Sequence, residues 1–200
     1  MSKKLRSLEE LQQLVAELKS EGKKVVQSHG VFDLLHIGHI RHLEEAKSLG
    51  DILITTVTPD EFVHKGPNRP AFQTALRLEA LAALGVVDFV AANTWASAVE
   101  TIKLIQPDIY CKGPDYKQHD EDLTGKISEE ESAVVSVGGT IHYTGGITFS
   151  SSNLLNEYGN VFSENQQDFL SRTASKSSPI QTLEAVNNLS GLRVLVLGES

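Results

Sequence analysis

Two histidines one helical turn apart are the residues of this 200-residue chain best suited to chemistry. They lie in the segment His36-Ile37-Gly38-His39, and the apolar residues that follow recur at the spacing of an amphipathic helix. Both imidazoles therefore fall on one face of the predicted helix, at its first turn. A helix N-terminus offers unpaired N–H groups and partial positive charge, and Gly38 has no side chain to keep a phosphate off the backbone. The pattern predicts a polyphosphate-binding site.

The same histidines allow a second interpretation as metal ligands. His42 extends the stripe formed by His36 and His39 by one more turn. A structural zinc ion needs four ligands, and no carboxylate or thiolate stands at an obvious completing position. No metal ligands are therefore assigned from the sequence.

The elements that position the histidines alternate between strands and helices. Strands are predicted over residues 24–28, 52–57, 86–90, 108–112 and 140–144. Helices are predicted over residues 7–22, 36–49, 70–84, 94–106 and 128–137, with capping signals at Ser7, Thr94 and Ser128. This alternation predicts an α/β fold: a Rossmann-like, doubly wound, five-stranded parallel sheet with helices on both faces. The loops after the first, second, fourth and fifth strands should converge on one crevice.

The composition changes near the end of the first predicted domain. Residues 1–160 form that domain, and residues 161–190 are polar and Ser-rich, as in a linker with short helices. A buried-type strand follows within residues 191–200, and it predicts the first strand of a further domain. The alternative is a sixth strand of the first sheet.

The charge and cysteine content narrow the class of protein. A net charge of −8 and a pI near 5.3 argue against a surface for nucleic-acid backbones. The lone Cys111 excludes an internal disulfide, and its apolar surroundings suggest a buried thiol. No signal peptide or membrane-spanning run is evident, so a cytoplasmic protein without a membrane partner is expected.

The residues from Gly30 to His39, read as G-x-F-D-x-x-H-x-G-H, resemble the cytidylyltransferase-like nucleotidyltransferases. The chain is most similar to the adenylyltransferase domain of bifunctional heptose-phosphate kinase/adenylyltransferases, from about Leu5 to Tyr158. The resemblance implies that His36 and His39 are catalytic donors to the triphosphate. It also implies that Gly30, Val31, Phe32 and Gly38 bind the nucleotide.

Further site residues come from the same resemblance. Lys65 matches a catalytic lysine that reaches the phosphate of the acceptor or of the transferred group. Lys112 and Asp115 lie in Lys112-Gly113-Pro114-Asp115-Tyr116-Lys117, which is similar to the family's K-G-x-D-Y-K. This resemblance implies that Lys112 binds the nucleotide and that Asp115 binds the substrate. The serines of a family segment that holds the triphosphate correspond to Ser150, Ser151 and Ser152.

Several residues of this set keep a structural alternative. Asp33 and Arg77 are expected to bind substrate, but Asp33 could equally order its loop and Arg77 could equally form a salt bridge. For Asp115 the alternative is a turn-forming role.

The resemblance implies transfer of a nucleotidyl group, AMP from Mg²⁺-bound ATP, to a sugar phosphate such as heptose 1-phosphate, with release of pyrophosphate. One alternative is a CTP-dependent enzyme acting on an alcohol phosphate such as glycerol 3-phosphate. Another is a catalytically silent nucleotide-binding module of a fused kinase. The family is often dimeric, and Leu192–Gly198 with Glu199 resembles the opening strand of ribokinase-like sugar kinases, which implies a covalently fused kinase domain.

A class I aminoacyl-tRNA synthetase is the remaining alternative. His36-Ile37-Gly38-His39 spells the first motif of those enzymes, and Thr173-Ala174-Ser175-Lys176-Ser177 faintly resembles the second. The second segment lies in linker-like sequence and the chain lacks a basic tRNA-binding surface, both of which argue against this class.

Overall fold

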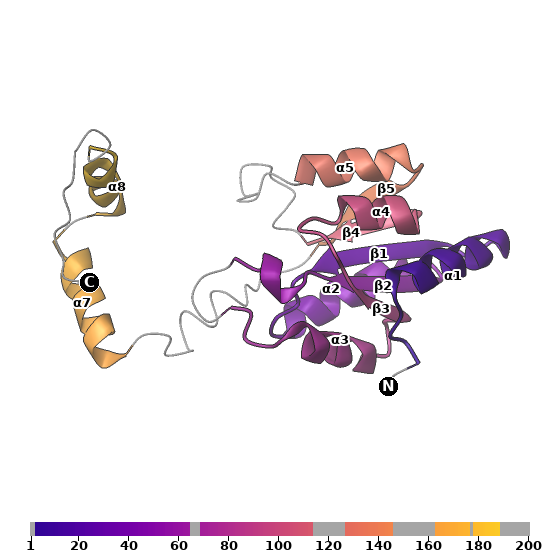
Figure 1. The fold of residues 1–200 in the computed structure, drawn as a ribbon, viewed down its shortest axis with the longest axis horizontal. Coiled ribbons are helices and arrows are strands. Elements are labelled where there is room, and N and C mark those ends of the chain that lie inside the picture. Colours follow the sequence, from indigo (N-terminus) through magenta and orange to yellow (C-terminus); the bar gives the residue numbers. More distant parts are fainter. Residues whose placement is uncertain (1–2, 65–68, 114–126, 146–162, 177, 189–200) are drawn as a thin grey trace, which may run out of the picture. The chain divides into compact units, whose positions relative to one another are not determined.

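Five parallel strands form the centre of the first of two compact units in the computed structural model of this protein (Figure 1). They pair in the order β3-β2-β1-β4-β5. Their bounds are β1 Val25–Gly30, β2 Ile52–Val57, β3 Phe89–Ala92, β4 Ile109–Lys112 and β5 Thr140–Tyr143. The predicted Rossmann-like five-stranded parallel sheet is confirmed.

The structure describes residues 3–64, 69–113, 127–145, 163–176 and 178–188. The first unit is Met1–Glu157 and the second is Tyr158–Ser200. Five of the expected site residues and the predicted terminal strand lie outside the described residues: Lys65, Asp115, Ser150, Ser151, Ser152 and Leu192–Gly198.

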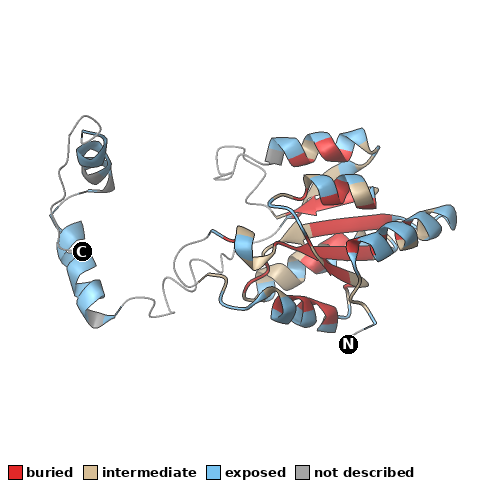
Figure 2. Cartoon of the chain, in the orientation of Figure 1, coloured by how far each residue is buried: buried red, intermediate tan, exposed pale blue. Residues whose placement is uncertain are grey.

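Helices cover both faces of the sheet, as predicted. The helices of the first unit are α1 Leu8–Ser20, α2 Ile37–Ser48, α3 Thr74–Ala83, α4 Val99–Ile105 and α5 Ile127–Ser136, with a short 3₁₀ helix η1 over Asp60–Phe62. One apolar cluster joins α2 and α3 to the sheet through Leu43, Leu81 and Val26. Another joins α1 and α4 through Leu11, Ile105 and Ile54, and α5 packs with α4 on this second face. Strands β1, β2 and β4 are accordingly mostly buried, whereas the helices expose their outer sides (Figure 2).

Local sequence signals explain where α1 and the central strands form. Ser7 caps α1, and its side chain and that of Glu10 form the predicted capping box, which satisfies two N–H groups that the helix leaves unpaired. β1 and β2 are buried over most of their length, as expected for strands covered on both faces. Cys111 in β4 is buried, and burial together with the nearby Glu45 raises the pKa of its thiol to about 12.

Several element boundaries differ from the prediction, including the ends of β1 and β3 and the starts of four elements. α3 begins at Thr74 instead of near Pro70, because the N–H groups of the preceding residues bind a side chain instead of forming a helical turn. α4 begins at Val99 instead of after Thr94, because the Asn93 amide donates to the carbonyls of Trp95 and Ser97 and holds a turn there.

Two further differences concern a strand and a helix start. β3 begins at Phe89, three residues after the predicted start at Val86. The Asp88 carboxylate accepts the Leu53 N–H at 2.7 Å, and regular strand pairing begins at the next residue. Ser128 lies inside α5, which already includes Ile127, and so is not the predicted cap.

Two helices make up the described part of the second unit. They are α7 Glu164–Ala174 and α8 Pro179–Asn187, and α8 matches the helix predicted there. Ser163 and Ser178 each form a capping box with a glutamine three residues later. Among the described residues, no helix combines the length and apolar character needed to cross a bilayer. The predicted domain boundaries after residues 160 and 190 stay predictions.

Candidate active site

His36 caps the N-terminus of α2 with its own imidazole. Its backbone is extended (φ −134°, ψ 173°), and its Nδ1 accepts the Gly38 N–H at 3.1 Å. An accepting Nδ1 carries no proton, so in the neutral ring the proton lies on Nε2. Burial lowers the pKa of His36, which favours this neutral form. The cap therefore fixes the tautomer that presents an N–H donor away from the helix.

His39 stacks on His36 and also contacts the ring of Phe32. The two imidazole centroids lie 4.0 Å apart, and the Phe32 ring meets His39 edge to face at 5.3 Å. Phe32 adopts a left-handed backbone conformation (φ 49°) that brings its ring back over Gly30. A Cβ on Gly30 would lie 3.2 Å from that ring, so glycine leaves the room this packing needs. The structure thus brings Gly30, Phe32, His36 and His39 together at the end of β1.

Asp33 orders the segment before α3. Its carboxylate accepts the N–H groups of Ala71 and Phe72 at 2.9 and 3.0 Å and forms an ion pair with Arg69 Nε at 2.9 Å. Asp33 and Arg69 are both nearly buried. Asp33 thus has the loop-ordering role that was the alternative to substrate binding. Its contacts hold residues 69–72 against the loop that follows β1.

Arg77 forms a salt bridge within the protein. Its guanidinium donates to the Val31 carbonyl at 2.6 Å, to Asp60 Oδ1 at 2.6 Å and to the Phe72 carbonyl at 2.9 Å. The side chain is fully buried. Burial by itself would raise the pKa of Asp60, but hydrogen bonds from Thr74 and Arg77 bring it below its usual value. The structure therefore favours the salt-bridge alternative for Arg77. The same guanidinium also fixes the Val31 carbonyl through a hydrogen bond.

Lys112, at the end of β4, is paired with a carboxylate that the sequence analysis did not identify. Its Nζ lies 2.6 Å from Glu130 Oε2, and the Tyr110 hydroxyl donates to the same carboxylate at 3.1 Å. Burial would raise the pKa of Glu130, but Lys112 and His29 together lower it, so the carboxylate is ionised. Burial and Lys112 lower the pKa of His29 to about 4. No pattern in the sequence indicates that Glu130 pairs with Lys112, because the two residues meet only through the packing of α5.

His42 points into the protein. Its Nε2 lies 2.7 Å from Ser28 Oγ and its Nδ1 lies 2.9 Å from Thr144 Oγ1. Burial lowers the pKa of His42 to about 4, so the ring is neutral. Both ring nitrogens are thus occupied by hydroxyls, which argues against the metal interpretation. Within the described ranges, no group of three or more His, Cys, Asp or Glu side chains could hold a metal ion.

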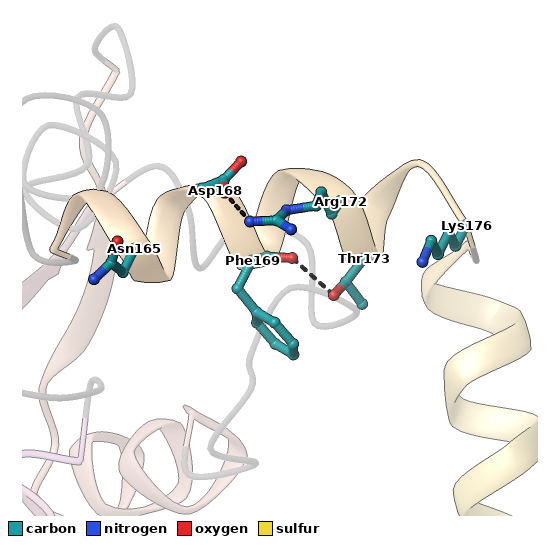
Figure 3. A pocket seen from close by; sticks show the side chains of 6 residues that line it. All are labelled: Asn165, Asp168, Phe169, Arg172, Thr173 and Lys176. Atoms are coloured by element: carbon teal, nitrogen blue, oxygen red, sulfur yellow. Dashed lines mark hydrogen bonds and ion pairs between the residues drawn. The ribbon is translucent and has the colours of Figure 1, made fainter.

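A separate hollow lies along α7 in the second unit (Figure 3). Its walls come from one helix and the chain directly after it, and Asp168 pairs there with Arg172. No residue expected from the sequence to act in the site lines it. The lining residues are Asn165, Asp168, Phe169, Arg172, Thr173 and Lys176.

The first unit has a Rossmann-like architecture: a parallel sheet in the order 3-2-1-4-5, with two stacked histidines at the start of the helix that follows its central strand. The family comparison agrees, since the profile described as cytidylyltransferase-like matches residues 28–180. The chain belongs to the cytidylyltransferase-like family.

Named relatives match part of the chain. The chain is 40% identical over 129 residues to the bifunctional protein HldE of Desulfatibacillum aliphaticivorans, covering 64% of this chain and 26% of that protein. It is 44% identical over 115 residues to the bifunctional protein HldE of Sulfurimonas denitrificans, covering 56% of this chain and 24% of the relative. The chain thus spans about a quarter of these relatives' length.

Solved structures show the same fold. A lipopolysaccharide core biosynthesis protein from Thermoplasma volcanium aligns with a TM-score of 0.52 and 30% identity, covering 64% of this chain and 100% of that chain. Pantoate-beta-alanine ligase from Francisella tularensis aligns with a TM-score of 0.55 at 14% identity, covering 76% of this chain and 72% of that one, which shows the shared fold alone.

Proposed function

We propose that this domain transfers AMP from ATP to a sugar phosphate such as heptose 1-phosphate and releases pyrophosphate. The observation that carries the proposal is the stacked pair His36 and His39, with the His36 tautomer fixed by the helix cap. The resemblance to the adenylyltransferase domain of bifunctional heptose-phosphate kinase/adenylyltransferases supports an adenylyl donor and a heptose-phosphate acceptor, and the kinship with proteins named bifunctional protein HldE supports a bifunctional relative. A cytoplasmic location and a covalently fused kinase belong to the same proposal.

In this reaction a phosphate oxygen of the acceptor attacks the α-phosphorus in line, and the bond to the pyrophosphate oxygen breaks. A protein nucleophile is not required, so positioning and charge stabilisation carry the catalysis. The Nε2–H of His36 donates to the phosphates, where negative charge grows on the leaving group. His39 is the second donor, and the N-terminus of α2 adds backbone N–H groups beside both.

The other expected site residues complete the proposal. Lys65 is proposed to contact the phosphate of the acceptor, and Ser150, Ser151 and Ser152 are proposed to bind the triphosphate. Asp115 is proposed to bind acceptor hydroxyls. Lys112 is proposed to contact the nucleotide from the end of β4, where its ammonium pairs with Glu130.

Magnesium fits this site as a companion of the triphosphate. Asp33, the carboxylate nearest in sequence to the histidines, is already engaged by Arg69 and two backbone N–H groups. Mg²⁺ is commonly bound through substrate phosphates and retained waters, and when bound it neutralises phosphate charge. The protein's own part is to bind and orient the phosphates through His36, His39 and the helix N-terminus.

The test is pyrophosphate release with ATP or CTP against a panel of sugar 1-phosphates and alcohol phosphates. We expect release with ATP and a sugar 1-phosphate, and a loss of about 10²–10³ in rate in His39→Ala, since one donor to developing charge is removed. Glu44→Gln, an exposed change on the same helix, should keep the wild-type rate.

Two outcomes would replace the proposal. Release only with CTP and an alcohol phosphate would identify a cytidylyltransferase of the same family. Nucleotide binding without turnover on any acceptor would identify a silent binding module.

A further inference from the structure

The second turn of α2 is hydrogen-bonded to β1 and to the residue that directly follows β5. His42 contacts Ser28 in β1 and Thr144 directly after β5, at 2.7 and 2.9 Å. Thr144 in turn contacts the carbonyl of Lys112 at the end of β4, through its hydroxyl at 3.2 Å and its N–H at 2.9 Å. One imidazole therefore joins three strands to the helix that carries His36 and His39.

The donor and acceptor of each hydrogen bond in this series can be assigned from the Lys112 carbonyl at its end. The Lys112 carbonyl can only accept, so the Thr144 hydroxyl donates its proton to it. Thr144 Oγ1 must then accept from His42, which places the imidazole proton on Nδ1. Nε2 of the neutral ring is left as an acceptor for the Ser28 hydroxyl. The result is a continuous series from Ser28 through His42 and Thr144 to Lys112.

Glu45, almost one turn further along α2, makes a second attachment to the same strand end. Its carboxylate accepts the Gly145 N–H at 3.1 and 3.2 Å, and His142 Nε2 lies 2.9 Å from Glu45 Oε1. His42 and Glu45 thus hold consecutive residues of the chain leaving β5. The inner face of α2 otherwise meets the sheet through apolar side chains such as Leu43 and Ala46.

We propose that His42 is a positioning residue for His36 and His39, an inference that rests on the proposed nucleotidyl transfer. Apolar contacts are not directional, so they allow α2 to slide or rotate slightly on the sheet. The hydrogen bonds of His42 are directional and set the helix in one axial position. His39 precedes His42 by three residues on the same helical face. The axial position of α2 therefore sets the positions of the His36 and His39 imidazoles. A displacement well below 1 Å is enough to slow a reaction that depends on alignment.

The test compares two substitutions of the residue that ends the hydrogen-bond series. Thr144→Val keeps the shape and removes the hydroxyl, whereas Thr144→Ser keeps the hydroxyl and removes a methyl group. We expect kcat to fall by about tenfold in Thr144→Val, to be restored in Thr144→Ser, and KM for the nucleotide to stay within about threefold. A packing role would give the opposite order of the two variants. Thr140→Val, at the other end of β5, is the matched control.

His42→Phe extends the test to the imidazole. It should lower kcat as Thr144→Val does, and the double variant should be no slower than the slower single variant, because both substitutions break the same hydrogen-bond series. Equal kcat in Thr144→Val and wild type, or additive losses in the double variant, would overturn the proposal.

A second readout separates this inference from the proposed function. If wild type and Thr140→Val both lack turnover, the proposed function has failed, and the imidazole resonances of His36 and His39 then test the positioning by NMR. Thr144→Val should shift these resonances, because it releases α2 from its position, and Thr140→Val should not. Neither substitution adds or removes an aromatic ring, so a shift would report a change in the position of the histidines. Unchanged resonances in Thr144→Val would refute the inference whatever the activity.

Discussion

Two buried neutral histidines should make the stability of the first unit depend steeply on pH. Burial lowers the pKa of His29 and of His42 from 6.5 to about 4. Each shift corresponds to about 3 kcal/mol of preference for the neutral form in the folded state. Between pH 6.5 and 4 the unfolded chain binds protons that the folded chain does not, so stability is lost as the pH falls through this window.

The slope can be worked out for each residue. Near pH 5 each histidine is mostly protonated in the unfolded chain and mostly neutral in the folded one, which gives about 1.2 kcal/mol per pH unit for one residue and about 2.5 kcal/mol for both. His42→Phe removes one titrating group and keeps a ring of similar size. We therefore expect the variant to lose about half of this slope, in addition to any constant loss of stability.

The assay is urea unfolding at several pH values between 4.8 and 7, followed by fluorescence. Trp95 is the one tryptophan in the chain and lies in the first unit, so its signal reports the unit that contains both histidines. Thr140→Val adds no titrating group and should keep the wild-type slope. An unchanged slope in His42→Phe would show that His42 is not held neutral, and the direction assigned to its hydrogen bonds would then be wrong.

Three further predictions concern the supports of the site. Arg77→Met should lower the free energy of unfolding by about 3 kcal/mol in urea titrations, because it removes a buried cation and the hydrogen bonds that it donates. Lys112→Met should destabilise by a similar amount, and Glu130→Gln in the same background should recover part of the loss, since the uncompensated buried carboxylate is then gone. Gly50→Ala should lower the thermal midpoint by several degrees because its Cβ would meet backbone at 2.7 Å, whereas Gly85→Ala, with nothing within 4 Å, should not.

The sequence was sufficient for several features that depend on neighbouring residues. The alternation of strands and helices predicted the parallel sheet, and the capping signal at Ser7 predicted the start of α1. The pairing of His36 and His39 also followed from their spacing alone, because residues three apart on a helix share a face.

Contacts between distant parts of the chain could not be predicted in this way. Lys112 meets Glu130 only because α5 packs beside β4, and His42 meets Thr144 across 102 positions. The stripe that contains His42 was recognised in the sequence, but periodicity indicates only which face a side chain shares. It does not indicate which strand end lies opposite that face.

The start of α3 was missed for a related reason. Pro70 and the residues after it have an acceptable helical pattern, but Asp33 competes for their N–H groups from a loop far back in the sequence. A tertiary contact thus overrode local preference, as it did where Asn93 delays the start of α4.

The buried thiol of Cys111 can report how often the sheet of the first unit opens. It is the single cysteine, it lies in a strand inside the sheet, and its raised thiol pKa keeps it unreactive in the folded state. A thiol reagent can modify it only in molecules whose sheet has opened, so the rate of modification measures how often β4 becomes exposed. A dye placed on a new cysteine at an exposed position such as Ser20 would meanwhile label the folded protein at that position alone, without any native thiol having to be removed.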